Sequence, residues 1–186
     1  PRVVVDLAYE EEITPDTLSH VGYTYLKAED KWRISDFACD YIHINKKSIR
    51  FKIPGTLRII QAFSVWSDNK NIEIYPELDA KQYLSNSHIH PELNFIYTTL
   101  PDLSSDLLLK LKSDTTAVLL IDTNNGHGMA EQRRLFVELM NNNCPVPVII
   151  GRYYETLDPE CLRLDAATDM GALLIDGFGD GIFIAS

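Results

Sequence analysis

"GALLIDGFGDGIFIAS", residues Gly171–Ser186, is the stretch that decides the fold. A run of apolar residues is interrupted twice by a glycine–aspartate pair and then resumes at once. Short apolar runs bounded by such residues are typical of buried strands joined by a tight turn. The stretch therefore predicts two strands, Ala172–Gly177 and Gly181–Ala185, with a sharp corner between them.

The polar residues of this corner resemble a calcium loop only loosely. Two of its acids are four residues apart, whereas an EF-hand loop has acids at alternate positions and a final glutamate. We therefore expect a structural turn, in which glycines allow the backbone geometry and aspartates bond to neighbouring N–H groups. The residues of this predicted turn are Asp176, Gly177, Gly179, Asp180 and Gly181.

Apolar runs of the same kind recur along the chain at fairly even intervals. Several are continuous rather than alternating, which favours strands buried on both faces, as in a parallel sheet. "SVWSDNKNIEI" predicts a β-hairpin built on Asp68, Asn69 and Lys70. The further predicted strands are Arg2–Leu7, Asp40–Ile44, Leu57–Ser64, Asn71–Tyr75, Asn94–Leu100, Ala117–Thr123 and Val146–Tyr154.

Helix signals separate the later strands. Ser104 or Ser105 can cap one helix, and "GMAEQRRLFVELMNNN" has apolar residues at helical spacing. A third helix is predicted to open with Asp158 as cap and Pro159 at its first position, and to close at Gly171. Strand and helix alternate, which predicts βαβ units and a parallel sheet within a single domain spanning 1–186.

The net charge of the chain limits the classes of partner that it can bind. The formal net charge is −10, and an acidic surface repels nucleic acid and anionic membranes. No apolar run reaches the ~18 residues of a membrane helix, and no signal peptide is recognisable. The basic run Lys46, Lys47, Arg50 and Lys52 is expected to be a solvated face rather than a binding patch. The start at Pro1, without Met, is typical of a domain cut from a longer protein.

Metal ligands are suggested at one place only. His88, His90 and Glu92 alternate in "SHIHPEL", so an extended chain would point all three the same way. However, Pro91 interrupts the set and no fourth ligand is evident, so loop histidines are the favoured interpretation. The three cysteines lie far apart in sequence and form no zinc or iron–sulfur spacing, which favours reduced thiols.

A second loop is a candidate for anion binding. "DTNNGHGMAEQRR" follows a predicted strand and opens a helix, where Gly126, His127 and Gly128 could expose free N–H groups to an anion. The pattern matches neither the dinucleotide fingerprint nor the phosphate-binding loop. The alternative, which we favour, is that Gly126 and Gly128 are needed for positive φ angles.

The ordered motifs of Ala130–Ser186 resemble those of one family. "RRLFVEL", "PVPVII" and "GALLIDGFGDG" are similar to segments of the large form of hydroxymethylbutenyl diphosphate synthase, the IspG or GcpE family. The resemblance is to the domain inserted between the two catalytic parts of plant-type and some bacterial enzymes. It implies that the parent is an oxidoreductase of the methylerythritol phosphate pathway of isoprenoid biosynthesis.

The resemblance also carries expectations about fold and cofactors. In that family a catalytic (β/α)8 barrel lies upstream and a domain with a [4Fe–4S] cluster lies downstream, with ferredoxin or flavodoxin as electron donor. The substrate barrel ends in a run related to "LLIDGFGDGIFIAS", but an arginine stands where this chain has Phe183. We therefore expect a TIM-like (β/α) barrel, incomplete or degenerate because the chain is short for that fold. An open, mainly parallel α/β sheet is the alternative.

These expectations define the predicted function. The chain lacks both of the cysteine-containing motifs that hold the [4Fe–4S] cluster in that family. It is therefore expected to be a non-catalytic spacer domain with no cofactor and no metal of its own. Its expected location is the bacterial cytoplasm, or a plastid if it comes from a plant. Its partners would be the other domains of the same polypeptide, and the electron donor is not expected to dock mainly here unless the four basic residues cluster. The alternative is a self-standing phosphate-ligand enzyme or sensor that uses the Gly126–Gly128 loop and the Asp176–Gly181 turn.

Overall fold

A computed structural model describes residues 1–87, 89–155 and 158–185 of the chain. Eight parallel strands close into a barrel, and each strand pairs with the strand that follows it around the barrel. The last strand pairs with the first, in the register Arg2↔Gly181 to Val5↔Ile184. The barrel strands are β1 (Arg2–Asp6), β4 (Tyr41–His43), β5 (Arg58–Ala62), β6 (Ile74–Asp79), β7 (Asn94–Thr98), β8 (Ala117–Ile121), β9 (Val148–Tyr153) and β10 (Gly181–Ala185).

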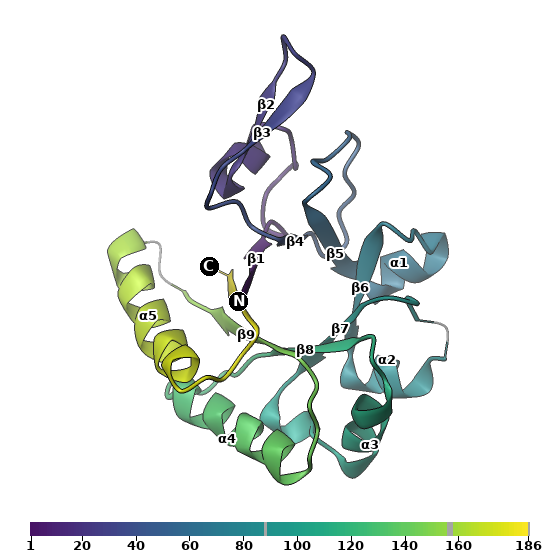
Figure 1. Ribbon diagram of the computed structural model, residues 1–186, viewed down its shortest axis with the longest axis vertical. Helices are drawn as coiled ribbons and strands as arrows, with labels where there is room; N and C mark the ends of the chain where they lie inside the picture. The colour runs from purple at the N-terminus through teal and green to yellow at the C-terminus, as the bar shows by residue number, and fades with distance from the viewer. Residues whose placement is uncertain (88, 156–157, 186) are drawn as a thin grey trace.

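Helices cover the outside of the barrel unevenly (Figure 1). Each crossover from β5 to β10 contains one α-helix, whereas the crossovers that follow β1 and β4 contain none in the described chain. These two omissions explain how the fold fits into fewer residues than usual. The helices are α1 (Phe63–Asn69), α2 (Ala80–Ser85), α3 (Ser105–Ser113), α4 (Gly128–Asn141) and α5 (Pro159–Ile175), with a 3-10 turn η2 (Leu100–Asp102) before α3.

A small β-hairpin unit replaces the missing first helix. It contains a 3-10 turn, η1 (Thr17–Val21), and the antiparallel strands β2 (Tyr23–Leu26) and β3 (Lys31–Ile34), which project away from the barrel in Figure 1. Leu18 and Tyr23 pack in one buried cluster with Ile42 of β4 and with Ile44, which directly follows that strand. The hairpin unit therefore covers the part of the barrel that lacks helices.

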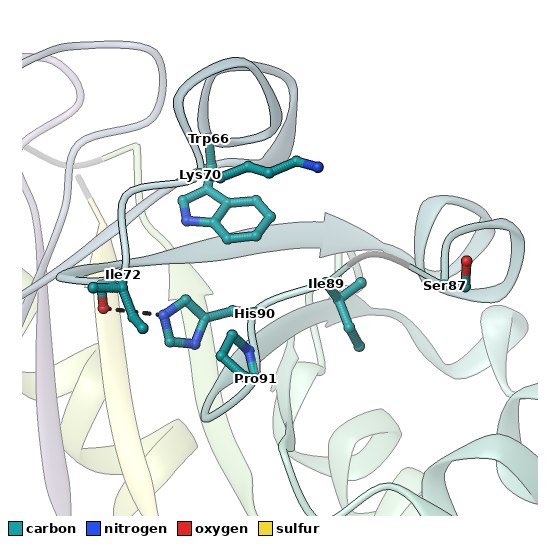
Figure 2. Close-up of a pocket in the computed structure, with 7 residues that line it drawn as sticks. All are labelled: Trp66, Lys70, Ile72, Ser87, Ile89, His90 and Pro91. Carbon is teal, nitrogen blue, oxygen red and sulfur yellow. Dashed lines mark hydrogen bonds between the residues drawn. The ribbon is translucent and has the colours of Figure 1, made fainter.

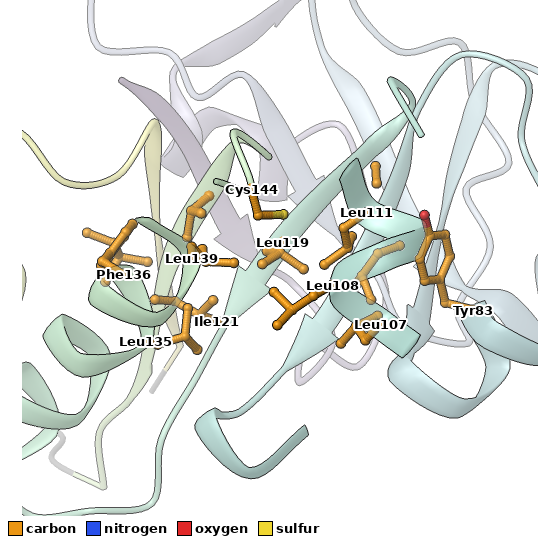
Figure 3. Close-up of a cluster of buried hydrophobic side chains, with 14 of the residues drawn as sticks. Tyr83, Leu107, Leu108, Leu111, Leu119, Ile121, Leu135, Phe136, Leu139 and Cys144 are labelled. Atoms are coloured by element: carbon orange, nitrogen blue, oxygen red, sulfur yellow. The ribbon is translucent and has the colours of Figure 1, made fainter. Parts of the chain in front are cut away.

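The main core lies between the strands and helices α3 to α5. Figure 3 shows α3 and α4 directing leucines toward Leu119 and Ile121, the outward-facing residues of β8. A separate cluster fills the lumen, where Val4, Ile60, Phe95 and Ile149 contact one another and Phe183 packs against them. The barrel interior is thus a packed core rather than a pore, as is usual for eight strands.

The structure confirms the closed TIM-like barrel and excludes the open-sheet alternative. Two local predictions were wrong. Residues 172–175, predicted as a strand, continue α5 through Gly171 to Ile175, because the whole segment is one helical crossover between β9 and β10. The predicted hairpin at Asp68–Lys70 is instead the end of α1, with Lys70 in the left-handed conformation, because β5 and β6 pair in parallel.

The glycine-rich turn that ends α5 is a helix cap followed by a strand start. Gly177 has φ +82° and its N–H donates to Leu174 O, while the Phe178 N–H donates to Leu173 O. This pair of bonds is a Schellman motif. Gly179 also has positive φ, at +85°, and a Cβ there would lie 2.6 Å from Ile150 Cδ1. The glycines therefore serve backbone geometry, as predicted, but between a helix and a strand.

Gly179 and Gly171 provide a matched pair of Gly→Ala substitutions. Gly179→Ala should lower the free energy of unfolding by about 1–2 kcal/mol or more, because alanine is strained at this φ and its Cβ meets Ile150. Gly171→Ala should raise it by about 0.5–1 kcal/mol, because a Cβ at this helical position meets open space. Urea titrations check both, and effects of the same sign would contradict the cap geometry.

Candidate functional site at the carboxyl end of the barrel

Five polar side chains converge where the barrel strands end. Val4, Tyr41, Tyr75 and Phe95 belong to the lumen cluster, and side chains alternate along a strand. The residue two positions further along each strand therefore also faces inward, at the end where TIM-barrel active sites lie. We call this group the mouth cluster; it consists of Asp6, His43, Glu77 and Tyr97, and of Asp122, which lies four positions beyond Val118 of the same lumen cluster.

His43 lies between two carboxylates of the mouth cluster. Its Nδ1 is 2.9 Å from Asp6 Oδ1, and its Nε2 is 3.3 Å from Glu77 Oε2, without the alignment of a hydrogen bond. The ring packs edge-on against Phe183, with centroids 5.5 Å apart. Burial favours the neutral imidazole, but the bond to Asp6 and the Glu77 carboxylate outweigh it and raise the pKa of His43 to about 9.

Tyr97 and Asp122 form the other half of the mouth cluster. The Tyr97 hydroxyl donates to Asp122 Oδ2 at 3.1 Å, and Asp122 Oδ1 accepts from the Thr123 N–H at 2.8 Å. Burial raises the pKa of Tyr97, and the neighbouring carboxylates raise it further. Burial also raises the pKa of Asp122, opposed by its hydrogen bonds. The phenol thus stays protonated, and the mouth cluster contains three carboxyl groups for one imidazole.

Arg152 is near this end of the barrel but its guanidinium is already bonded. Its Nε donates to Asp169 of α5 at 3.0 Å, and one terminal nitrogen donates to Thr123 O and Asn125 O at 3.0 and 3.2 Å. Tyr154 donates to the same Asp169 oxygen at 3.2 Å. Arg152 therefore links the loop after β8 to α5, and its Nε and one terminal nitrogen are used in these bonds.

The structure assigns a definite role to one glycine of the predicted anion loop. Gly126 and Gly128 do not have positive φ, so that explanation was wrong. Instead, a Cβ on Gly128 would lie 2.4 Å from the Arg152 guanidinium, so a larger residue would shift this side chain from its bonds to Thr123 O and Asn125 O. The His127 N–H donates to Asn125 Oδ1, and the Asn125 amide donates to Glu131 in the first turn of α4. Anion binding at Gly126, His127 and Gly128 stays a prediction.

His90 is a structural histidine at the opposite end of the barrel. Its Nδ1 accepts from the N–H groups of Glu92 and Leu93, at 3.1 and 3.2 Å, so its Nε2 carries the proton donated to Ile72 O. Both ring nitrogens are used and the side chain is buried, as expected for a loop histidine. His88, the other predicted metal candidate, lies outside the described residues.

The hollow beside His90 has one other titratable residue, Lys70, among the described residues that line it, and no carboxylate. It has a volume of about 320 Å³ and is lined by Trp66, Lys70, Ile72, Ser87, Ile89, His90 and Pro91 (Figure 2). Across the described residues, no three histidine, cysteine, aspartate or glutamate side chains are grouped as metal ligands would be. Glu92 donates its backbone N–H to His90 Nδ1, and metal binding by His88, His90 and Glu92 stays an untested alternative.

The Asp176–Gly181 turn also lies at the amino end of the barrel, before β10. Asp180 accepts from the Val148 N–H at 2.9 Å, so it bonds to a backbone N–H as predicted, although one on the neighbouring strand. Asp176 differs from the prediction because its carboxylate pairs with Arg133 of α4 at 2.5 Å. The turn and the Gly126–Gly128 loop are at opposite ends of the barrel, about 16 Å apart by strand rise, and do not form one site.

The mouth cluster was missed by sequence reasoning. Each of its members is at or near the end of an apolar run, as in "RVVVD", "YIH" and "AVLLID". A polar residue that ends a buried parallel strand is the signal that points to such a position once a barrel is assumed. The sequence around His43 does not indicate its two carboxylate neighbours, because they are distant in the chain and belong to β1 and β6.

The fold and this polar mouth define the chain as a parallel (β/α)8-type barrel domain with an acidic carboxyl end. No family model and no solved structure matches it. It is 34% identical over 145 residues to a 4-hydroxy-3-methylbut-2-en-1-yl diphosphate synthase (flavodoxin) of Parabacteroides distasonis. It is 28% identical over 148 residues to the enzyme of the same name from Phocaeicola vulgatus.

These matches cover 78% and 80% of the chain but only 23% and 24% of the relatives. The chain therefore spans about a quarter of the length of the curated relatives that it matches. The predicted resemblance is confirmed: the chain is homologous to a segment of the 4-hydroxy-3-methylbut-2-en-1-yl diphosphate synthase family. None of the helices in the described ranges has both the length and the apolar content needed to cross a membrane.

The His43 contacts predict a pH-dependent stability. The pKa of His43 is raised in the folded state, from 6.5 to about 9, so its contribution is complete below pH ~6.5 and is lost as pH rises through ~9. The loss should be of the order of 3 kcal/mol between these limits. Urea unfolding at a series of pH values measures it. His43→Gln should flatten the profile in this window, and an unchanged slope would contradict the arrangement.

Proposed function

We propose that this domain is a non-catalytic spacer and interface barrel of a longer iron–sulfur oxidoreductase. By its resemblance, that enzyme reductively converts methylerythritol cyclodiphosphate to hydroxymethylbutenyl diphosphate in isoprenoid biosynthesis. The relatives are bacterial enzymes whose names include flavodoxin, which supports a flavodoxin-type electron donor for the whole protein. A cytoplasmic location is part of the same proposal. The remaining domains of the same polypeptide would hold the substrate and the [4Fe–4S] cluster.

The charge of the mouth cluster is the observation that carries this proposal. A diphosphate needs fixed positive charge, which an arginine fork supplies best. At the carboxyl end of this barrel the inward-facing groups are three carboxyls, a phenol and one imidazole already paired with Asp6. Phe183 packs in the lumen cluster, where the resemblance implies that a substrate barrel has arginine. These groups would repel a diphosphate rather than bind it.

The path of the chain supports a role as a spacer. β1 begins at the amino end of the barrel and β10, its parallel neighbour, finishes at the carboxyl end. Segments joined to both ends of this domain would therefore leave from opposite ends of the barrel. A domain traversed in this way separates its neighbours by about the length of a strand and its loops, roughly 16 Å or more.

The competing function, a self-standing phosphate-ligand enzyme or sensor, has less support. It combined the Gly126–Gly128 loop with the Asp176–Gly181 turn, which lie at opposite ends of the barrel. The loop by itself has Glu131 in the first helical turn, and Arg152 is held by Asp169 and two carbonyls. A phosphate at the start of α4 would have to displace or tolerate that carboxylate.

Substrate binding tests the proposal directly. Calorimetry with the cyclic diphosphate should detect no saturable binding up to about millimolar concentration, for the unmodified domain and for Phe183→Arg alike, because the other anion contacts are missing. Phe183→Ala should lower the free energy of unfolding by about 2 kcal/mol, less than for a fully buried phenylalanine. Phe37→Ala, at a 78% exposed side chain, is the control and should change it little. Micromolar binding would overturn the proposal.

Iron–sulfur reconstitution tests the cofactor assignment. Cys39 and Cys144 belong to different buried clusters, and Cys161 is exposed at the start of α5. Burial raises the pKa of Cys39 to about 11, which disfavours the thiolate that iron requires. The domain should therefore stay colourless after anaerobic incubation with iron and sulfide. A stable brown product with stoichiometric iron would show that the cluster site is here.

A further inference from the structure

Four cations stand out in the loop between β4 and β5. Lys46, Lys47, Arg50 and Lys52 occur within seven residues of a chain whose net charge is −10. None of them forms an ion pair with any residue that the structure describes. Unpaired basic groups so concentrated on an acidic molecule create a local field of opposite sign to their surroundings.

The loop stands where the barrel pattern would place a helix, at the carboxyl end of the molecule beside the loop that follows β1. Lys46, Lys47 and Arg50 line one hollow of about 540 Å³ together with Ser48 and the segment Glu11–Pro15. Three of the four basic residues therefore line one hollow, and Lys52 follows two residues after Arg50 in the same loop. Clustering of these residues is the condition under which the electron donor was expected to dock on this domain.

The backbone that carries these cations is held in place. The Gln61 amide donates to Lys47 O at 2.7 Å, and the Trp32 indole N–H donates to Lys52 O at 3.2 Å. Phe51 packs near Trp32, with ring centroids 6.2 Å apart, and joins the buried cluster under the hairpin unit. Because the backbone of the loop is already held, mainly the side chains would lose conformational entropy on binding.

We propose that the β4–β5 loop, through Lys46, Lys47, Arg50 and Lys52, is a docking surface for an acidic protein. Charge complementarity selects this partner, because the loop is the main concentration of unpaired positive charge on an acidic domain. Screening confines the repulsion from the rest of the surface to charges within about 10 Å of the contact. The inference rests on the proposed function for the choice of probe, since the relatives are named as flavodoxin enzymes.

The geometry favours a protein over a small anion. Glu11 and Glu12 line the same hollow as the cations, so a phosphate seated inside it would be near two carboxylates as well. Lys52 does not line the hollow, although it belongs to the same basic run. A protein footprint of about 800 Å² is large enough to include a seven-residue loop, and so could contact Lys52 as well as the cations that line the hollow.

The experiment compares two triple variants of equal net charge. Lys46→Gln, Lys47→Gln and Arg50→Gln alter the docking surface, whereas Lys81→Gln, Lys112→Gln and Arg163→Gln remove the same charges from exposed positions on α2, α3 and α5. Binding of oxidised flavodoxin is measured by calorimetry at about 50 and about 300 mM salt. Inorganic pyrophosphate is the competitor that represents a small anion.

The triple variant of the docking surface should weaken flavodoxin binding at least about tenfold, and the control triple variant by less than about twofold. High salt should weaken the binding of flavodoxin to the unmodified domain. Absence of binding, equal effects of both triples, or displacement of flavodoxin by pyrophosphate would overturn the inference. Circular dichroism confirms that both triples are folded. The spacer function does not depend on this outcome, because it is tested separately with the cyclic diphosphate.

Discussion

The pairing of β1 with β10 closes the barrel, and the placement of the other strands depends on it. The Arg2 N–H donates to Asp180 O at 2.7 Å, and Asp180 exchanges hydrogen bonds with the backbone of Val148 at the start of β9. Asp180 thereby fixes the register of three neighbouring strands. A Cβ at Gly181 would lie 2.6 Å from Arg2 O, so the seam closes only because glycine stands there.

Closure of the barrel also explains the chemistry of its mouth. Once the lumen is filled by Phe95, Phe183 and their neighbours, the next inward positions are partly shielded from water. Carboxyl groups there are costly to ionise without partners, and the structure meets that cost with a protonated imidazole and a phenol. The same barrel end has a compensating basic loop, but outside the lumen. Positive and negative charge are thus separated between the rim and the centre.

Much of the fold could be predicted from the sequence because strand and helix signals are local. Ser104 and Asp158 cap α3 and α5 as predicted, and the continuous apolar runs match most of the parallel strands. The errors have a common origin. Residues 172–175 and Asp68–Lys70 carry patterns compatible with a strand or hairpin, and only the parallel pairing of distant strands makes them helical.

The candidate site was harder to predict for a related reason. His43, Asp6 and Glu77 come from three different strands, and their distances depend on the register around the closed barrel. The apolar run of each strand was recognised, but its last polar residue carried no sign of its neighbours. The role of Gly128, which makes room for Arg152 from the next strand, was hidden in the same way.

The parallel seam has a mechanical consequence. Because β1 and β10 are neighbours and run in the same direction, forces that pull the two chain ends apart along the barrel axis act on their hydrogen bonds in shear. Bonds loaded in this way share the force and must break together, whereas bonds at a peeled edge break one at a time. A barrel joined in line between moving domains would therefore transmit tension rather than unravel, and its resistance would be set by the rate of unfolding.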